Sequence, residues 1–388
     1  MTNRFLFWAI ILLIVIVLFY LSPLYLYNKN IYHGQSLKQF EVLLNEHVSE
    51  LMDYYQIPGA NIALVKNGQL IWVKAYGYAD IENKKPMTVK SYCRVESISK
   101  PVVAWGIMRL VQEGKLNLDT PVIKYIKDWS FPKNNYSVNR ITAKMLLSHT
   151  SGLPLGTIGV RYSPNDTNIP ELKDRLSNDA VLIKEPGKSF TYSNTGFNIL
   201  ELLIEDVSGL DFNRYMTDSL LIPLGMVNSS FEWSEKWNPE VPKGYDLKGK
   251  AIPVYIYPDK ASGGLFATPI DIATFICAGM PLFSDKANKV LNSLQINKLY
   301  QPVVKIPGVY GFAFDFYGLG FFIEQLPDGK IAVSHGGQGS GWMTHFCSIP
   351  ETGDAIVIFT NSQRSWPFFC KYYQRLGKME WFFIYGNE

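Results

Sequence analysis

The chain has 388 residues, of which 47% are hydrophobic, enough for a large folded core. The formal net charge is +3 and no run of like charges is long, so the composition gives no sign of a nucleic-acid or acidic partner. The cysteines, Cys93, Cys277, Cys347 and Cys370, are too few and too widely spaced for a disulfide framework. No CxxC pair or HExxH helix predicts a metal site. Free thiols are expected, although an external compartment would permit one bridge.

The N-terminal segment is strongly apolar. Residues 5–27, FLFWAIILLIVIVLFYLSPLYLY, contain no charged side chain. As a helix rising about 1.5 Å per residue, this stretch would cross a bilayer core about 30 Å thick. A cleaved signal peptide would have a shorter apolar core followed by small residues, whereas Tyr20 and Pro23 stand here. The sequence therefore predicts an uncleaved transmembrane anchor over 1–27, followed by a polar linker over 28–40.

The charges that flank this segment are few. Arg4 and the amino terminus precede it and Lys29 follows it, so the positive-inside bias toward an external body is small. We expect a single-pass protein of the cell membrane whose folded body lies outside the cytoplasm.

Strands are predicted at both ends of the folded body, and helices between them. Apolar side chains recur at helical spacing over residues 40–55. Residues 61–79 alternate apolar and polar residues around Asn67-Gly68, a dipeptide typical of a two-residue hairpin turn. The pattern is mostly helical over 98–290 and strand-like again over 319–361. Because an isolated hairpin is only marginally stable, the two ends should meet in one sheet, with the helices packed beside it.

The stretch RVESISKPVVAWG, residues 94–106, places two serines and a lysine at the start of an amphipathic helix. Positions three apart share a helix face, so Ser97 and Lys100 can touch while Ser99 points elsewhere. A base must remove the proton of a hydroxyl nucleophile, and a lysine that burial keeps neutral can do so. Free N–H groups at a helix start would also face an oxyanion. The alternative is an N-cap serine and a surface lysine paired with Glu96.

Two later segments contain residue types that such a site needs. In EPGKSFTYSNTGFNILELLIEDVSG, Tyr192 and Asn194 lie in a turn before a periodic helix, where a phenol can relay or take a proton. Ser193 or Asn194 can instead serve as a helix cap. In VSHGGQGSGWMTHF, His335 and several glycines end one strand and precede another. A lone histidine is usually structural, and a following strand excludes a dinucleotide loop.

The order SxxK, YxN and His-x-Gly resembles the serine β-lactamase and penicillin-binding-protein family, and in particular its class C-like, esterase-like branch. The segments IPGANIALVKNGQLIWVKAYGYAD, LLSHTSGLP, IPLGM, ASGGLFATPIDIATF and FTNS also look like family landmarks. They extend the resemblance over the catalytic domain that we expect at 41–365. The resemblance implies an α/β fold of the α+β type, the β-lactamase/DD-peptidase fold. In it, a five-stranded antiparallel sheet is flanked by helices and an α-helical lobe, with the active site between them and no cofactor or metal.

The resemblance also implies roles for individual residues. Ser97 would be acylated, and Lys100 and Tyr192 would share the proton transfers. Asn194 and His335 would hold the substrate, with His335 standing where many relatives have the lysine of a Lys-Thr-Gly triplet.

The same resemblance implies an oxyanion hole made by the backbone N–H groups of Ser97 and Gln338, with Gly337 allowing a close approach of the substrate. His149, in the SHTSGLP loop, looks architectural and outside the site.

Glu96 departs from the family pattern, because relatives commonly have a small residue before the nucleophile. Pairing with Lys100 would favour the ammonium form of the lysine and remove its basicity. A residue just outside a helix should have extended backbone angles, so we expect Glu96 to cap or brace the site without touching Lys100.

The expected function is that of a membrane-anchored serine hydrolase that cleaves an amide or ester bond of a small molecule or peptide through a Ser97 acyl-enzyme. A β-lactamase, a DD-peptidase and an esterase all fit. A neutral imidazole at His335 would attract a substrate carboxylate less than an ammonium, which favours an esterase or peptidase. The alternative is a non-turnover penicillin-binding or sensor-type membrane protein that acts through its anchor and the aromatic tail, 366–388. The chain has no GxSxG elbow, which excludes an α/β-hydrolase.

Overall fold

The structure, a computed structural model, describes residues 37–365 apart from 157–159, 238–239, 285–287, 289, 309–310 and 312–313. The chain divides into two compact units. The first comprises Met1–Val48 and Gln374–Glu388, and only the beginning of helix α2 is described in it. The second, Ser49–Tyr373, holds all the described strands and the candidate site described below.

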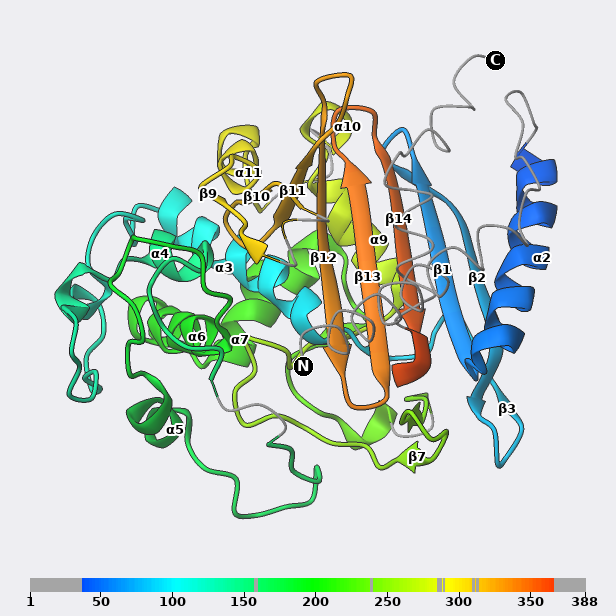
Figure 1. Cartoon of the computed structure of the whole chain (residues 1–388), viewed down its shortest axis with the longest axis horizontal. Helices are drawn as coiled ribbons and strands as arrows, with labels where there is room; N and C mark the ends of the chain where they lie inside the picture. Colours follow the sequence, from blue (N-terminus) through cyan, green and yellow to red (C-terminus); the bar gives the residue numbers. More distant parts are fainter. Residues whose placement is uncertain are drawn as a thin grey trace, which may run out of the picture. The chain divides into compact units, whose positions relative to one another are not determined.

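A broad antiparallel sheet dominates the second unit (Figure 1). Its described strands follow the order β3-β2-β1-β14-β13-β12-β11-β10-β9. The strands of this sheet are β1 (Gly59–Lys66), β2 (Gln69–Asp80), β3 (Lys85–Pro86), β9 (Val304–Lys305), β10 (Phe316–Tyr317), β11 (Phe322–Gln325), β12 (Ile331–Gly339), β13 (Trp342–Ile349) and β14 (Asp354–Thr360). The expected count of five strands is therefore wrong. Five long strands, β2, β1, β14, β13 and β12, form the centre, and four shorter ones extend it at both sides.

The two ends of the folded body meet in this sheet, as the sequence predicts. Strand β1 pairs with β14 in register from Ala60↔Thr360 to Val65↔Ala355. The turn between β1 and β2 consists of Asn67 and Gly68, with φ angles of 50° and 69°. Positive φ at both positions is what a two-residue hairpin turn requires, which explains the choice of these residues.

Helices and short strands fill the middle of the chain. The described helices are α2 (Leu37–Tyr55), α3 (Ser99–Gln112), α4 (Ala143–Leu147), α5 (Leu172–Asp179), α6 (Asn194–Ser208), α7 (Phe212–Met216), α8 (Ile222–Leu224), α9 (Pro269–Ala278), α10 (Pro281–Ser284) and α11 (Ser293–Leu299). The 3₁₀ and π turns are η1 (Glu96–Ile98), η2 (Val122–Lys124), η3 (Val138–Arg140), η4 (Thr217–Leu221), η5 (Glu235–Trp237) and η7 (Gln363–Ser365). The remaining short strands are β4 (Cys93–Arg94), β5 (Ser229–Ser230), β6 (Gly244–Tyr245), β7 (Ala251–Ile252) and β8 (Phe266–Ala267).

Two sets of helices surround the sheet. Helix α9 packs against β1, β2 and β14, while α6 packs against α3, α4, α5 and α7 to form a helical lobe beside the β12 side (Figure 1). The short turn η1 joins these parts, because it contacts β12 and β13 and leads directly into α3.

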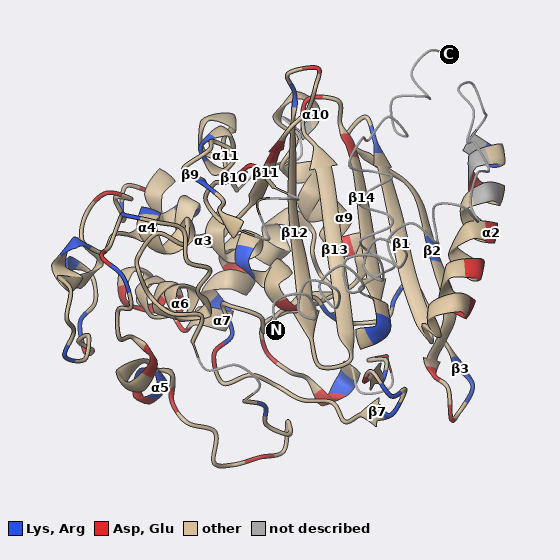
Figure 2. Cartoon of the chain, in the orientation of Figure 1, with Lys and Arg blue, Asp and Glu red and all other residues tan. Residues whose placement is uncertain are grey.

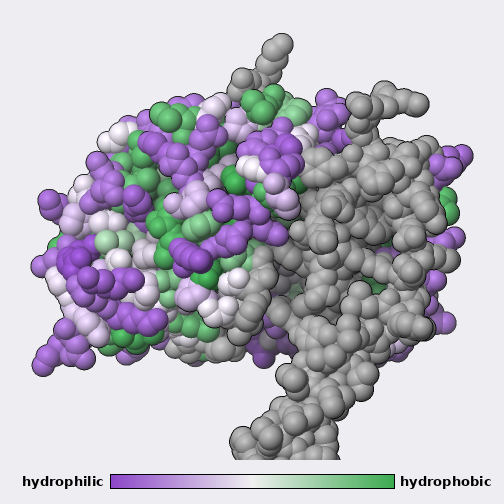
Figure 3. Space-filling model, turned by 45° about the horizontal axis from the view of Figure 1, so that its top comes forward, coloured by the Kyte–Doolittle hydropathy of each residue, from purple (hydrophilic) through white to green (hydrophobic). Residues whose placement is uncertain are grey.

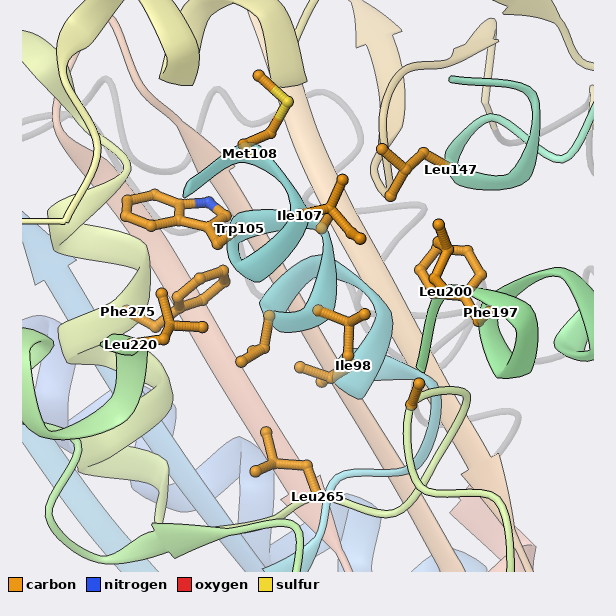
Figure 4. Packing of buried hydrophobic residues seen from close by; sticks show 14 of the residues in the cluster. Ile98, Trp105, Ile107, Met108, Leu147, Phe197, Leu200, Leu220, Leu265 and Phe275 are labelled. Atoms are coloured by element: carbon orange, nitrogen blue, oxygen red, sulfur yellow. The ribbon is translucent and has the colours of Figure 1, made fainter. Parts of the chain in front are cut away.

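Helix α3 lies in the middle of the hydrophobic core (Figure 4). Its Trp105 packs edge-on against Phe275 of α9, with ring centroids 5.2 Å apart. Ile107 points to the side of the lobe, where Leu147 and Leu200 lie. A fully buried side chain of this size contributes about 1.5–3 kcal/mol. The core therefore holds the beginning of α3 firmly in place.

Two central strands of the sheet, β12 and β13, differ in charge from the loops and helices. Strands β12 and β13 contain no Lys, Arg, Asp or Glu, whereas charges of both signs are spread over loops and helices (Figure 2). Hydrophilic and hydrophobic side chains alternate in small patches over the described surface in Figure 3.

Some expectations fall at the edges of the described residues. Helix α2 begins at Leu37, so the last residues of the expected linker, 28–40, are helical. No helix among the described residues is long and apolar enough to cross a membrane, and the expected anchor, 1–27, and the aromatic tail, 366–388, lie outside them.

Cys93 and Cys277 are free thiols, the first buried and the second half-buried. Cys347 is buried, and Cys370 lies outside the described residues. Burial raises the pKa of the Cys93 thiol to about 12, so this thiol is inert at neutral pH.

Candidate active site

Ser97 and Lys100 meet at the junction of η1 and α3, as their spacing predicts. Ser97 is the central residue of η1 and Lys100 the second residue of α3. The Nζ atom of Lys100 lies 3.0 Å from the Oγ atom of Ser97. Ser97 is half-buried and therefore open to a substrate, whereas Lys100 is 0% exposed.

The surroundings of Lys100 suit a neutral amine. Its Nζ donates to the carbonyl oxygen of Ser262 at 2.6 Å, and it lies 5.0 and 5.6 Å from the ring centroids of Tyr192 and Phe197. Burial lowers the pKa of Lys100 to about 7, although the Glu96 carboxylate acts in the opposite direction. A large fraction of Lys100 is thus uncharged at neutral pH and able to accept a proton.

Ser99 points away from this pair, as expected. Its hydroxyl donates to the backbone oxygen of Glu96 at 2.6 Å and accepts from the N–H of Leu265 at 3.0 Å. It therefore ties η1 to the chain before β8 and is not available for attack on a substrate.

Tyr192 and Asn194 lie in the turn before α6. Ser193 caps this helix, because its hydroxyl accepts from the N–H of Gly196 at 2.9 Å. The cap places the half-buried Tyr192 against Lys100 and leaves Asn194, also half-buried, as the first residue of the helix. The structure thus brings Tyr192 together with Ser97 and Lys100.

His335 lies near Tyr192 but is enclosed by the protein. Their ring centroids are 6.3 Å apart, and His335 is 1% exposed. Its Nδ1 donates to the Gly336 carbonyl at 2.7 Å, so its Nε2 accepts from the Tyr317 hydroxyl at 3.1 Å. Burial, together with the charge of Lys100, holds the pKa of His335 well below its usual range. A substrate group would have to displace one of these bonds to reach the imidazole.

Gly337 is close to the nucleophile turn itself. A Cβ atom there would lie 2.1 Å from the carbonyl oxygen of Val95 and 2.4 Å from the Oγ1 atom of Thr344. The missing side chain of Gly337 thus makes room for the residues before Ser97, and its expected role toward the substrate stays a prediction. Gln338 follows directly and is exposed.

Among the described strands, only β13 pairs with the second half of β12, which lies beside η1. Strand β11 pairs with β12 only from Phe322↔Ser334 to Gln325↔Ile331. Residues 335–339 pair with β13 on one side and face η1 on the other. The N–H groups of Ser97 and Gln338 thus belong to neighbouring backbone segments, as an oxyanion hole requires.

Glu96 makes no hydrogen bond or ion pair with Lys100 among the described contacts. Its carboxylate accepts from Arg94 and from the hydroxyls of Tyr255 and Tyr257. We expected extended backbone angles at Glu96 to keep its side chain away from Lys100. This explanation is wrong, because Glu96 has a left-handed φ of 51°. Its partners could not be predicted, since Tyr255 and Tyr257 lie about 160 residues further along the chain.

His149 is fully buried and packs against the ring of Tyr192. Its Nδ1 accepts from the N–H of Ser193 at 3.1 Å, and its ring centroid lies 4.2 Å from that of Tyr192. Burial and the nearby charge of Lys100 hold the pKa of His149 well below its usual range. These contacts give it the architectural role expected from the sequence, although it lies closer to Tyr192 than expected.

The loop that supplies the Ser262 carbonyl is held by a residue that sequence reasoning missed. One oxygen of the Glu201 carboxylate accepts from the N–H groups of Lys260 and Ala261, both at 2.7 Å. Burial raises the pKa of Glu201 to about 8. A glutamate in the middle of the apolar α6 sequence ILELLIE was the signal that could have revealed it.

A serine and a buried lysine of lowered pKa at the start of a helix, beside a phenol and the end of a strand, are typical of a serine hydrolase of the SxxK type. The chain belongs to the Beta-lactamase family, whose model matches residues 44–376. The family resemblance of the sequence motifs is thereby confirmed, with its α/β fold of helices and an antiparallel sheet.

Relatives in this family include penicillin-binding proteins. The chain is 25% identical to Penicillin-binding protein 4* of Bacillus subtilis (strain 168) over 85% of its length and 72% of that protein. It is 33% identical to Protein flp of Staphylococcus aureus (strain N315) over 52% of its length, and this match spans only 40% of protein flp. The octameric penicillin-binding protein homologue from Pyrococcus abyssi shares the fold with a TM-score of 0.73, at 26% identity over 87% of this chain and 77% of that one.

Proposed function

We propose that this protein cleaves an amide or ester bond through an acyl-enzyme on Ser97. The observation that carries the proposal is the 3.0 Å contact between Ser97 Oγ and the Nζ atom of a fully buried Lys100. An amine whose pKa is about 7 can remove the proton of the hydroxyl at neutral pH, which a surface lysine cannot do.

The proposed reaction has two halves. Lys100 accepts the hydroxyl proton as Ser97 Oγ attacks the substrate carbonyl, and the N–H groups of Ser97 and Gln338 stabilise the oxyanion. Tyr192, whose ring lies beside Lys100, passes the proton to the leaving group, while Asn194 binds the substrate. Water then releases the acyl group, with the same side chains acting in reverse.

The environment of His335 argues against a substrate that is bound through a carboxylate at this position. The imidazole is neutral and both its nitrogens are bonded within the protein, so it supplies no positive charge for a substrate carboxylate. We therefore propose an ester or peptide substrate rather than a substrate that is held through a carboxylate at this position.

The second candidate function is that of a penicillin-binding protein without turnover: penicillin acylates the protein, but the acyl-enzyme is not hydrolysed. The name of the Bacillus subtilis relative favours it. It predicts one equivalent of bound penicillin without continued hydrolysis of any substrate.

The proposal includes attachment to the cell membrane, with the catalytic unit outside the cytoplasm. It is supported by the uncharged residues 5–27. Fractionation of the full chain, followed by protease treatment of intact cells, tests it: recovery in the soluble fraction would refute attachment.

Ser97→Ala is the decisive variant. We expect it to lose all labelling by a fluorophosphonate and by a fluorescent penicillin. Ser99→Ala, whose hydroxyl faces Glu96 and Leu265, should keep most of the labelling and is the matched control. Equal labelling of wild type and Ser97→Ala would exclude Ser97 as the nucleophile.

Turnover of nitrocefin, short-chain nitrophenyl esters and D-amino-acid peptides by wild type then distinguishes the substrate classes. Absence of turnover for all of them would favour the non-turnover alternative.

A further inference from the structure

The residue before the nucleophile has an unusual conformation and environment. Glu96 has a φ of 51°, in the left-handed region that residues other than glycine avoid. It is also 3% exposed, and burial of a carboxylate is unfavourable unless the group is paired and hydrogen-bonded. The contacts of the carboxylate must therefore compensate for both effects.

Those contacts form a compact group, which we call the carboxylate cluster: Arg94, Glu96, Tyr255 and Tyr257. One oxygen of Glu96 accepts from Arg94 Nε at 3.0 Å and from the Tyr255 hydroxyl at 2.9 Å. The other accepts from the Tyr257 hydroxyl at 2.9 Å. The guanidinium carbon lies 4.2 and 4.5 Å from the centroids of the two tyrosine rings. The charges compensate one another, which explains how the pair is tolerated inside the protein.

The carboxylate cluster also binds the backbone near Ser262, whose carbonyl is a hydrogen-bond partner of Lys100. Arg94 donates from Nη1 to the carbonyl of Tyr255 at 2.8 Å and from Nη2 to the carbonyl of Gly263 at 3.4 Å. Gly263 directly follows Ser262, whose carbonyl accepts from Lys100. The cluster thus fixes the segment that orients the amine of Lys100.

The cluster also abuts the end of β12. The Tyr255 hydroxyl lies 3.1 Å from the carbonyl oxygen of Ser340. A Cβ atom on Gly339 would lie 2.2 Å from Glu96 Oε1, so the carboxylate rests directly on the backbone of Gly339. Gly339 follows Gln338, whose N–H we assign to the oxyanion hole.

We propose that Glu96 is a positioning residue whose carboxylate cluster fixes the Ser97 turn against the Ser262 carbonyl and the Gln338 backbone at once. The catalytic consequence rests on the proposed function, whereas the effect on backbone order does not. The Ser97 turn, the Ser262 carbonyl and the Gln338 backbone belong to three separate segments, and the carboxylate cluster contacts each segment, at Glu96 itself, at Gly263 and at Gly339.

The negative charge of Glu96 has a second effect, which works against catalysis because it keeps more of Lys100 protonated at neutral pH. Its carboxylate acts to raise the pKa of Lys100 against the effect of burial. The other titratable groups around the amine are Tyr192, His149 and His335, and both imidazoles are neutral. Loss of the Glu96 charge should therefore move the titration of Lys100 to lower pH, while loss of its contacts slows acylation at every pH.

The test compares Glu96→Gln with Tyr257→Phe in the full chain. Tyr257→Phe removes one hydrogen bond to Glu96 and leaves all charges in place, so it is the matched control for charge. Amide hydrogen exchange is measured without substrate, and fluorophosphonate labelling of Ser97 is measured from pH 5 to pH 9. We expect exchange in 255–265 and 336–343 to rise about tenfold in Glu96→Gln and less in Tyr257→Phe, with 59–80 unchanged. Plateau labelling should fall in both variants, and the midpoint pH should fall only in Glu96→Gln.

Unchanged exchange in these two segments in Glu96→Gln overturns the proposal, as does a higher labelling plateau, which would show that Glu96 only suppresses the base. If Glu96→Gln does not fold, Tyr257→Phe decides alone: raised exchange supports the proposal and wild-type exchange refutes it. A wild type that is not labelled at Ser97 refutes the proposed function, and hydrogen exchange then still decides the role of Glu96.

Discussion

Lys100→Met should make the protein more stable and inactive at the same time. Methionine fills a similar volume without a group that must lose its proton on burial. The pKa of Lys100 is about 7 in the folded chain, compared with an ordinary value of 10.5. Between these values the unfolded chain binds more protons than the folded chain, so the free energy of unfolding of wild type rises with pH through this interval.

The magnitude follows from the same two values. Each pKa unit corresponds to about 1.4 kcal/mol, so neutralisation of Lys100 on folding costs about 4 kcal/mol at pH 7 and about 2 kcal/mol at pH 9. The variant loses the hydrogen bonds to Ser97 and Ser262, each contributing about 1 kcal/mol. We therefore expect Lys100→Met to be more stable than wild type by about 2 kcal/mol at pH 7, and by close to nothing at pH 9.

Urea unfolding of wild type and Lys100→Met at pH 7, 8 and 9 measures this difference. Fluorophosphonate labelling of the same samples should be lost in the variant at every pH. A difference in stability that does not change between pH 7 and pH 9 would refute the reasoning, because it would mean that Lys100 keeps an ordinary pKa in the folded chain.

Two further predictions concern other buried polar groups. Glu201 has a pKa of about 8 in the folded chain, above its ordinary 4.5, so the folded chain binds more protons between these values and stability falls as pH rises through them. Glu201→Gln keeps an acceptor for Lys260 and Ala261 and should reduce this fall by about 3 kcal/mol between pH 5 and pH 8 in urea unfolding; parallel curves would contradict it. Tyr317→Phe leaves Nε2 of buried His335 without its donor and should cost about 1–3 kcal/mol, whereas exposed Tyr136→Phe should cost nearly nothing; equal unfolding midpoints would contradict the hydrogen bond.

Much of the fold could be predicted because its signals are local. Asn67-Gly68 determines the first hairpin through its backbone preferences, and the alternating residues on both sides place β1 and β2. The short strands at the sides of the sheet could not be predicted in this way. Two-residue strands such as β9 and β10 are too short to show alternation and depend on pairing with their neighbours.

The candidate site could be predicted to the extent that its chemistry follows from spacing. The three-residue separation of Ser97 and Lys100 and the turn that carries Tyr192 were sufficient to bring these residues together. The role of the Ser262 carbonyl could not be predicted, because any residue can supply a backbone oxygen. Nor could the partners of Glu96 be predicted, since they depend on a left-handed backbone angle and on contacts that are distant in sequence.

The outermost strands of the sheet affect how copies of the protein behave in solution. A long, flat outer strand exposes a row of unsatisfied amides and carbonyls that can template the addition of a neighbouring molecule. Here β3 consists of Lys85–Pro86 and β9 of Val304–Lys305. Two residues offer too short a row, the proline has no N–H to contribute, and a lysine on each side repels a second copy. At these two strands, little edge is thus left for a second copy to extend.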